Sequence, residues 1–506
     1  MHRNPGKSVT GDSYLRSRYG VILGYIGLIM MISSLFLLLP LSVLFAWPAE
    51  KELAFAFLVP AGSLLGIGLL LWFFFKPPPG TDLTLEEARV SVLLSWIALF
   101  IFSAWPFYLG ADMSWTLALF EAVSGWTTTG LTVVDEQSTL HIFLLWRSIM
   151  QVGGGAGLAI LMLASVTGPI GPSLGRAEGR QQLVPNVKAS AKVVLILYVG
   201  YIVIGILGYS LAGLGFFDAV NHSLAAVSTG GFSTKGASIG HWNSIAVEAV
   251  SLPLMILGNL NFLVAWLILR GKIRAVSKNG ELRFFTCLLL LVIPLLFFLT
   301  VQGIYPSLGK EIRVAVFETV TALTTTGFTS TSYQGWNAVG MFLTIVLMFI
   351  GGGTGSTAGG IKQFRIYLLF KSIYWAIRRE LLPRSAVEFN SVWEGDNEIQ
   401  VSKNLQVRVG GYAFLYLVAI GVGATVLMAH GYGFMESLFE YASAQGTVGL
   451  SVGITGPQAP PGVLYTEMVG MFLGRLEFLV ILIGIVKLSR DVPSLVKSSR
   501  DVDTPE

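Results

Sequence analysis

Four short stretches combine Thr or Ser hydroxyls with glycine, and they recur roughly every 100 residues. They read FEAVSGWTTTGLTV (120–133), NHSLAAVSTGGFST (221–234), FETVTALTTTGFTS (317–330) and FEYASAQGTVGLSV (439–452). The shared glycines are Gly130, Gly231, Gly327 and Gly449. Glycine permits backbone conformations that turn consecutive carbonyl oxygens in one direction. A ring of such carbonyls, with hydroxyls beside them, can replace the hydration shell of a monovalent cation.

A second unusual stretch, GGGTGSTAGG at 351–360, lies between the apolar runs MFLTIVLMFI and IKQFRIYLLF. A helical glycine costs about 1 kcal/mol relative to alanine, so these glycines predict a break near mid-membrane and a candidate gate. Small residues at i and i+4, such as Gly351 and Gly355, also allow close helix packing. That alternative applies more strongly to GGGAG at 153–157. A phosphate-binding loop is excluded, because GxxxxGK[ST] is absent and no strand precedes the stretch.

Enzyme chemistry has no candidate residues. The five histidines are scattered, and the single cysteine, Cys287, permits no intrachain disulfide and is expected to be a core residue. There is no nucleophile–base set, intramembrane carboxylate pair or metal-spaced histidine group, so we expect no enzyme and no organic cofactor.

The elements that position these stretches are membrane helices. The 506 residues are 53% hydrophobic and 12% charged, with a mean hydropathy of +0.70, whereas soluble proteins carry roughly 25% charged residues. Apolar runs of about 20 residues recur along the chain. We predict an all-α polytopic membrane protein with ten crossings, at about 19–46, 53–75, 89–109, 139–167, 190–213, 243–270, 284–305, 338–376, 408–429 and 465–487.

Basic residues collect in alternate connections between these crossings. They are Arg16 and Arg18; Arg176, Arg180, Lys188 and Lys192; Lys272, Arg274, Lys278 and Arg283; Arg378, Arg379, Arg384 and Lys403; and Lys487, Arg490, Lys497 and Arg500. The positive-inside rule therefore predicts that both termini and these connections are cytoplasmic.

The repeats predict one unit used four times: a span, a short re-entrant helix, a Thr/Gly-rich loop and a second span. Non-helical backbone at membrane depth must be buried in protein or line a watery cavity, so we expect the four loops to meet at one axis in a pseudo-fourfold arrangement. The predicted units are two leading transmembrane helices (1–80), pore repeats 1 to 4 (81–170, 171–275, 276–405 and 406–490) and a cytoplasmic tail (491–506).

The segments TTTGL, STGGF, TTTGF and GTVGL resemble the four pore loops of the Trk/Ktr/HKT superfamily of potassium transporters, and the leading span pair and LTLEEARVSVLLSWI resemble the TrkH/TrkG subgroup. The resemblance implies potassium uptake through a selectivity filter, and glycine at position 130 favours potassium. Gly230, an extra glycine, is expected to loosen one quarter of the ring. The implied filter residues are Thr127, Thr128, Thr129, Gly130, Ser228, Thr229, Gly230, Gly231, Thr324, Thr325, Thr326, Gly327, Gly446, Thr447, Val448 and Gly449.

The resemblance also implies a gate beneath the filter. Its residues are Gly351, Gly352, Gly353, Thr354, Gly355, Ser356, Thr357, Ala358, Gly359, Gly360 and Arg475. An intramembrane charge such as Arg475 is a functional candidate by default. The alternative is a structural pair with Glu467 or Glu477, although residues two apart do not share a helix face.

Several polar residues near the loops have two possible roles. Glu121, Glu318 and Glu440, with His222 in the second repeat, could attract cations or brace the loops through backbone N–H groups. Asn259, Asn261, Arg147 and Gln151 could line the cavity or tie helices together, whereas Lys362 and Arg365 are expected to face the cytoplasmic vestibule.

The family resemblance implies partners and a location as well. It implies a homodimer in the bacterial inner membrane, and a cytoplasmic regulatory subunit of dinucleotide-binding fold (TrkA-like) that binds ATP/ADP or NAD(H); no nucleic acid is implied. K⁺ would be the transported ion. A sodium- or proton-coupled carrier, for which broken helices are also typical, is the main alternative, although fourfold repetition argues against it.

Overall fold

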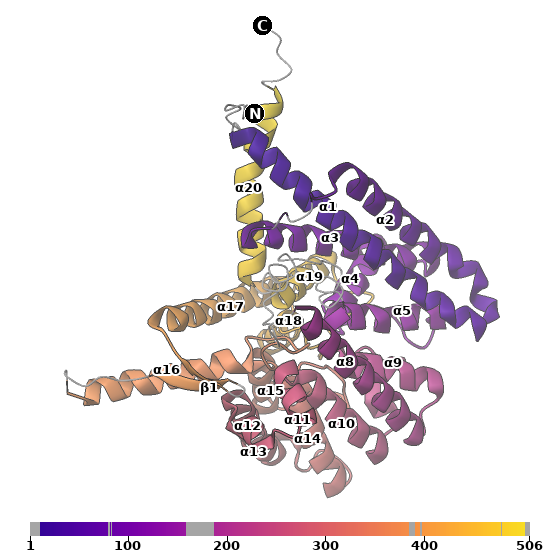
Figure 1. Cartoon of the computed structure of the whole chain (residues 1–506). Coiled ribbons are helices and arrows are strands. Elements are labelled where there is room, and N and C mark those ends of the chain that lie inside the picture. Colours follow the sequence, from indigo (N-terminus) through magenta and orange to yellow (C-terminus); the bar gives the residue numbers. More distant parts are fainter. Residues whose placement is uncertain are drawn as a thin grey trace.

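The computed structural model describes residues 11–78, 81, 83–157, 187–383, 390–394, 397–476 and 478–500. Figure 1 shows these residues as a bundle of helices, with the start of α1 and the end of α20 near each other at the top. The Tyr19 hydroxyl donates to Asp491 Oδ2 (3.1 Å), which joins these two helices. The two ends of the described chain therefore lie on the same side of the bundle.

Most of the described chain is helical. The first half contains α1 (Gly11–Leu38), α2 (Ala54–Phe75), α3 (Leu85–Gly110), α4 (Trp115–Trp126), α5 (His141–Val152), α8 (Val187–Leu211), α9 (Phe216–Val227), α10 (Ile245–Asn259) and α11 (Phe262–Leu269). The second half contains α12 (Ile273–Lys278), α13 (Gly280–Leu296), α14 (Leu308–Leu323), α15 (Ala338–Ile350), α16 (Gln363–Leu381), α17 (Lys403–Ala429), α18 (Phe434–Gln445), α19 (Pro461–Leu476) and α20 (Phe478–Arg500).

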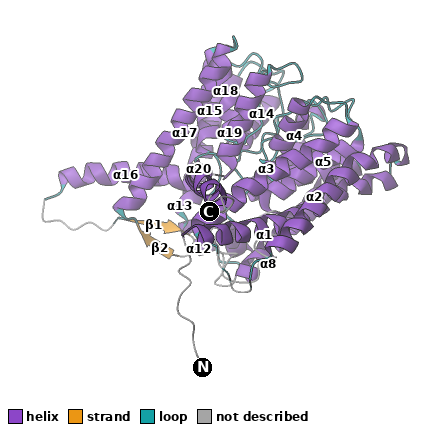
Figure 2. Ribbon diagram, turned by 90° about the horizontal axis from the view of Figure 1, so that it is seen from above, coloured by secondary structure: helices purple, strands orange, loops and turns teal. Residues whose placement is uncertain are grey.

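Short elements complete the chain. Turns of 3₁₀ helix occur at Leu39–Phe45, Pro48–Leu53 and Ser238–His241, and π-helical turns at Gly153–Gly157 and Phe297–Val301. Strands β1 (Ser391–Glu394) and β2 (Asn397–Gln400) form an antiparallel hairpin in which Ser391 pairs with Gln400. In Figure 2 this hairpin lies beside α12 and α13, and α16 projects away from the bundle.

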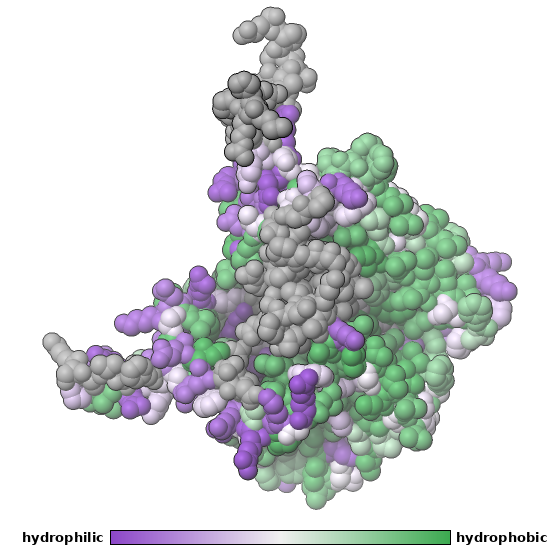
Figure 3. All heavy atoms as spheres, in the orientation of Figure 1, coloured by the Kyte–Doolittle hydropathy of each residue, from purple (hydrophilic) through white to green (hydrophobic). Residues whose placement is uncertain are grey.

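Among the described residues, six helices are long and apolar enough to cross a membrane. They are Tyr14–Phe45, Pro48–Phe75, Leu85–Gly110, Lys192–Leu211, Gly280–Val301 and Lys403–Ala429. Figure 3 shows apolar side chains over a broad face of the bundle, with hydrophilic ones gathered toward its edges. A contiguous apolar surface of this size is expected to contact lipid. Cys287 is exposed, so the prediction that it is a core residue is wrong.

Several predicted crossings are bent or broken. The crossing predicted at 243–270 is the pair α10 and α11, bent by 113°, and the one at 465–487 is α19 and α20, bent by 103°. The crossing predicted at 338–376 consists of two helices, α15 and α16, joined by the non-helical stretch 351–360; α15 is a shorter apolar helix, and α16 is not among the candidate spans of the described residues. The crossing at 139–167 is described only to Gly157, and Arg176, Arg180, Arg384 and Glu477 lie outside the described residues.

The break between α10 and α11 has a local cause. Leu260 is extended (φ −70°, ψ 141°), and the Asn261 side chain caps α11 by accepting from Leu263 N–H (2.8 Å). An Asn at this position competes for backbone donors and favours a new helix start. Sequence reasoning read 243–270 as one helix because its apolar run is continuous.

One order of elements occurs four times: a long helix, a short helix, an irregular segment, and a helix that is bent, broken or continued as a π turn. The short helices α4, α9, α14 and α18 occupy the second place in each set. The first set begins at α3 with a capping box, in which the Thr84 side chain accepts from Glu87 N–H and the Glu87 side chain accepts from Thr84 N–H. The leading helices support this set through Glu50, which accepts from His141 N–H (3.1 Å) and Ile142 N–H (2.9 Å) at the start of α5.

Candidate functional site

The four short helices end in the same way. The residue after each C-cap has a left-handed backbone: Thr128 (φ 55°), Thr229 (51°), Thr325 (53°) and Thr447 (49°). In the first repeat, Thr128 N–H donates to Gly125 O (3.1 Å) and Thr129 N–H to Ser124 O (2.9 Å). This is a Schellman ending, which normally uses glycine at the left-handed position. A β-branched residue there is an outlier, and such strain is concentrated at functional sites.

Each of the four segments ends at a glycine, two residues after the left-handed threonine. Gly130 (φ 91°), Gly231 (73°), Gly327 (81°) and Gly449 (91°) all have positive φ. A Cβ on each would collide with the carbonyl oxygen of the next segment: Gly230 O (2.2 Å), Thr326 O (2.1 Å), Val448 O (1.8 Å) and Thr129 O (2.2 Å), in that order. The contacts run from the first segment to the fourth and back to the first. We call these four residues the glycine ring.

The glycine ring faces one cavity. A hollow of about 210 Å³ is lined by all four ring glycines, with Arg147 of α5 and the neighbouring Glu136 and Lys235. The four segments therefore come together around one cavity. Within the described residues, no group of three or more His, Cys, Asp or Glu side chains could hold a metal ion.

Buried acidic side chains brace the segments. Glu121 accepts from Val133 N–H (3.1 Å), Glu318 from Ser330 N–H (2.8 Å), and Glu440 from Val452 N–H (2.9 Å) and Thr455 N–H (2.9 Å). All three side chains are at most 1% exposed. In the second repeat, His222 Nε2 lies 3.0 Å from Ser233 Oγ instead. These side chains could attract cations or brace the loops. Their geometry is that of bracing, because they are buried and accept from backbone N–H groups of the loops.

Two residues of α5 hold the first and second segments together. Arg147 donates to Glu121 Oε1 (2.7 Å) and to Ser233 O (3.0 Å), and its guanidinium lies 4.1 Å from the centre of the Phe232 ring. Gln151 donates to Gly230 O (2.5 Å) and accepts from Phe232 N–H (3.3 Å). A Cβ at Gly230 would lie 2.3 Å from the Gln151 amide. Gly230 therefore makes room for the Gln151 amide, which braces the second segment. This geometry does not support the expectation that Gly230 loosens the ring.

The stretch 351–360 is non-helical, as predicted, and is held at several points. Gly351 (φ 66°) ends α15, and Gly352 N–H donates to Gly359 O (3.0 Å) across the base of the loop. Gly353 N–H donates to Asn259 Oδ1 (2.9 Å). Glu281 Oε1 accepts from Thr354 N–H (2.6 Å) and from Phe364 N–H (3.2 Å), so one carboxylate joins the loop to the start of α16.

The 351–360 loop also touches the left-handed threonines of the glycine segments. Gly359 N–H donates to Thr325 Oγ1 (2.7 Å), and Thr229 Oγ1 donates to Thr357 Oγ1 (3.1 Å). A Cβ at Gly359 would lie 2.1 Å from both Gly446 O and Thr447 Oγ1. The loop is therefore pressed against the segments on the side that bears the left-handed threonines. Close helix packing, the alternative for this stretch, does not describe these contacts.

Arg475 joins this loop to the first repeat. Its guanidinium donates to Thr357 O (2.6 Å), to Gly155 O (2.8 Å) and to Gly154 O. Glu467, considered as a partner from the sequence, accepts instead from the Thr455 hydroxyl (3.0 Å). The stretch 153–157 thus supplies carbonyl acceptors, and it also packs closely, because a Cβ at Gly154 would lie 1.8 Å from Trp126 O.

The remaining sequence candidates have smaller roles. Lys362 and Arg365 donate to carbonyls of their own segment, Ala358 O and Ile361 O, and both are half-buried. Sequence reasoning missed Glu281 and the acceptors Gly154 and Gly155. A signal for Glu281 existed: an acidic residue at the start of an otherwise apolar span needs a buried partner.

Comparison with known proteins agrees with this architecture. Residues 67–492 match the TrkH family model, described as a cation transport protein. The TrkG potassium uptake protein of the Trk system in Escherichia coli K12 is 31% identical over 484 residues, covering 92% of this chain and 98% of the relative. An uncharacterized cation transporter of Methanocaldococcus jannaschii is 28% identical, covering 91% of this chain and 94% of the relative.

A solved structure has the same fold. The crystal structure of the potassium transporter TrkH from Vibrio parahaemolyticus aligns with a TM-score of 0.80 at 26% identity, covering 92% of this chain and 98% of that one. The helices, the apolar surface and the central ring of backbone define a cation-transporting membrane protein. More particularly, this chain belongs to the TrkH family of cation transport proteins.

Proposed function

We propose that this protein takes up potassium through a gated, channel-like pore and forms the membrane subunit of a Trk-type system. The observation that carries the proposal is the closed glycine ring, in which each glycine abuts a carbonyl of the next segment beneath one shared cavity. The relatives named as Trk potassium uptake proteins support potassium as the ion.

The four segments 127–130, 228–231, 324–327 and 446–449 serve as the selectivity filter. Carbonyl dipoles arranged about an axis can substitute for the water of a dehydrated K⁺. The hydroxyls of Thr128 and Thr447 support this role, because both are buried and neither has a hydrogen-bond partner among the described residues. These orphaned oxygens are suited to an ion or to water on the inner side of the ring.

The 351–360 loop and Arg475 serve as the gate. The loop lies against the left-handed threonines, and the Arg475 charge bonded to Thr357 O would raise the barrier for a cation. Backbone that is irregular at membrane depth is acceptable beside a conduction path. Because Arg475 also bonds Gly154 O and Gly155 O, it fastens the loop to the opposite repeat.

Partners and orientation follow the family. We propose a homodimer in a bacterial inner membrane with both termini cytoplasmic, and a separate cytoplasmic subunit of dinucleotide-binding fold that responds to ATP/ADP or NAD(H). The word "system" in the relatives' names supports a second component. The contact between Tyr19 and Asp491 supports termini on one side.

The test of the filter is ⁸⁶Rb⁺ uptake into proteoliposomes in competition with K⁺ or Na⁺. Wild-type uptake should be inhibited by K⁺ and not by Na⁺. Gly130→Ser should weaken that preference, because a side chain there meets Gly230 O and needs positive φ. Gly453→Ser is the matched control, since Gly453 has φ 97° but open space around it. Equal loss of preference in both variants would contradict the filter. Uptake that requires a Na⁺ or proton gradient would favour the coupled carrier.

A further inference from the structure

The cavity at the glycine ring lies on the side of the ring away from the 351–360 loop. It is lined by the ring glycines and by residues that follow them in the chain, whereas the loop bonds the left-handed threonines that precede them. The positive-inside rule assigns the basic connections to the cytoplasm, and none of the four segments lies in one of those connections. The cavity is therefore the outer mouth, where an ion would enter.

Glu136 places a carboxylate on the wall of this mouth. Among the described residues that line the cavity, Glu136 is the acidic one. It comes from the irregular segment between α4 and α5 and reaches the second repeat, because a Cβ at Gly236 would lie 3.6 Å from Glu136 Oε2. Glu136 Oε1 lies 3.6 Å from Arg147 Nη2, which is too long for a hydrogen bond. The Glu136 charge is therefore not consumed in a close ion pair.

The two cations on the cavity wall have other carboxylate partners. Arg147 Nε lies 2.7 Å from Glu121 Oε1, in a pair that is almost completely buried. Lys235 Nζ lies 3.8 Å from Asp218 Oδ2. Together with Glu136, three carboxylates oppose two cations. One net negative charge remains, and it is the charge of Glu136 that faces the cavity.

A single charge has a large effect in a narrow mouth. A cleft lined by charge of one sign, with low-dielectric walls, raises the local concentration and the association rate of counter-ions by about 10- to 1,000-fold. The cavity has a volume of only about 210 Å³, so charges on its wall act within the screening length of about 8 Å in physiological salt. Such a charge attracts K⁺ and Na⁺ alike, because it acts on charge and not on ion size.

We propose that Glu136 concentrates monovalent cations at the outer mouth and thereby sets the KM for uptake, with Lys235 opposing it. The preference between ions is left to the four segments of the filter. This inference rests on the proposed function and deepens it, because it names the residue that brings the ion to the filter.

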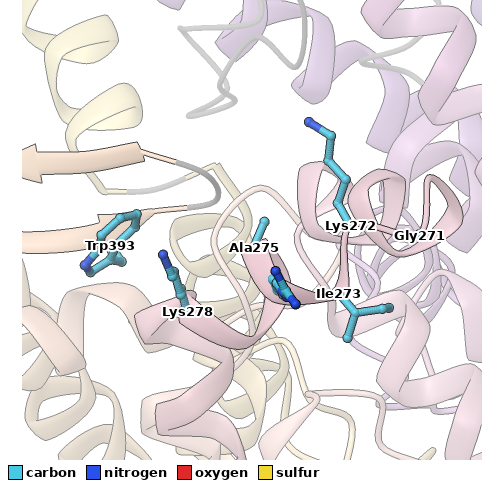
Figure 4. Close-up of a pocket in the computed structure, with 7 residues that line it drawn as sticks. Gly271, Lys272, Ile273, Ala275, Lys278 and Trp393 are labelled. Carbon is cyan, nitrogen blue, oxygen red and sulfur yellow. The ribbon is translucent and has the colours of Figure 1, made fainter.

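The test is ⁸⁶Rb⁺ uptake into proteoliposomes at low ionic strength, measured over a range of Rb⁺ concentrations. Glu136→Gln should raise the KM on the order of tenfold, with the maximal rate and the competition by Na⁺ little changed. Lys235→Gln should lower the KM, and the double variant should lie between the two single ones. The matched control is Glu398→Gln, which removes one carboxylate from β2 and should keep the wild-type KM. Glu398 pairs with Trp393 in the hairpin, where the Trp393 ring lies beside Lys278 (Figure 4).

Ionic strength separates charge from a structural contact. Addition of N-methylglucamine chloride should reduce the KM difference between Glu136→Gln and the wild type, since salt screens exposed charges. A KM that is unchanged in Glu136→Gln, or that shifts in the same direction in Glu136→Gln and Lys235→Gln, would overturn the role of Glu136. If Glu136→Gln does not fold, as judged by thermal unfolding, Lys235→Gln is measured alone, and an unchanged KM overturns the role.

Failure of the proposed function has a different signature. The same uptake is measured in Arg475→Ala, which lacks the bonds that hold the proposed gate. Absence of Rb⁺ uptake by both the wild type and Arg475→Ala would contradict the pore itself, and the role of Glu136 with it. Uptake by either protein whose KM does not respond to Glu136→Gln would overturn the role of Glu136 alone.

Discussion

At the scale of single residues, the four left-handed threonines connect the proposed filter to the proposed gate. Each costs on the order of 1–3 kcal/mol in backbone strain. Thr229 and Thr325 bond the 351–360 loop, whereas the buried hydroxyls of Thr128 and Thr447 have no hydrogen-bond partner among the described residues. If the proposed gate moves, the Thr229 and Thr325 hydroxyls would lose these loop partners.

Arg475→Ala should raise ion flux. The substitution removes the bonds to Thr357 O, Gly155 O and Gly154 O, and hydrogen bonds to a charged group are worth about 1.5–3 kcal/mol each. Rb⁺ uptake measures the effect, and the melting temperature should fall. Arg475→Lys keeps the charge but not the fork of donors, so its flux should lie between the other two. Unchanged flux in a folded Arg475→Ala protein would argue against the gate.

At the residue scale, sequence reasoning found the residues that recur and missed those that do not. The ring glycines appear four times in the chain, so their alignment predicted a shared axis. Arg475 was predicted from its intramembrane charge and from the family resemblance. Its acceptors in the first repeat were not, because carbonyls of Gly154 and Gly155 carry no signal in the side-chain pattern. Contacts made through backbone oxygens depend on tertiary placement.

At the scale of elements, the 351–360 loop, which we propose to be the gate, is fixed at both ends and held at its middle. Gly352 pairs with Gly359 at the base, Asn259 and Glu281 hold one side, and Arg475 holds the other. Asn259 ends α10, so the bend between α10 and α11 brings its amide to the loop. The apolar pattern predicted the crossing but not its bend, since periodicity does not report where an Asn starts a new helix.

Glu281→Ala should weaken the attachment of the 351–360 loop to the start of α16. The carboxylate accepts from Thr354 N–H and Phe364 N–H, and both donors would lose their partner. Hydrogen exchange at these two amides should become faster, with a rise in Rb⁺ uptake. Glu281→Gln keeps an acceptor oxygen and should change both quantities less. Protection of the two amides as in the wild type would show that Glu281 does not clamp the loop.

At the scale of the whole molecule, we expect both termini on the cytoplasmic side, as the positive-inside rule and an even number of predicted crossings indicate. With Cys287→Ser as the background, single cysteines at Arg16, Gln458 and Arg490 report on three exposed positions. A membrane-impermeant thiol reagent outside intact cells should label Gln458→Cys alone, because Tyr19 and Asp491 hold the two chain ends on one side. Labelling of Arg16→Cys or Arg490→Cys from outside would contradict cytoplasmic termini.

We propose above that the 351–360 loop closes a potassium-selective pore. The most direct measurement is ⁸⁶Rb⁺ uptake into proteoliposomes by the wild type and by a variant lacking residues 354–357. This deletion removes the contacts to Glu281 and Arg475 and keeps the paired base at Gly352 and Gly359. The account predicts higher uptake by the variant, still inhibited by K⁺ and not by Na⁺. Uptake that is unchanged or lower in a well-folded variant would contradict it.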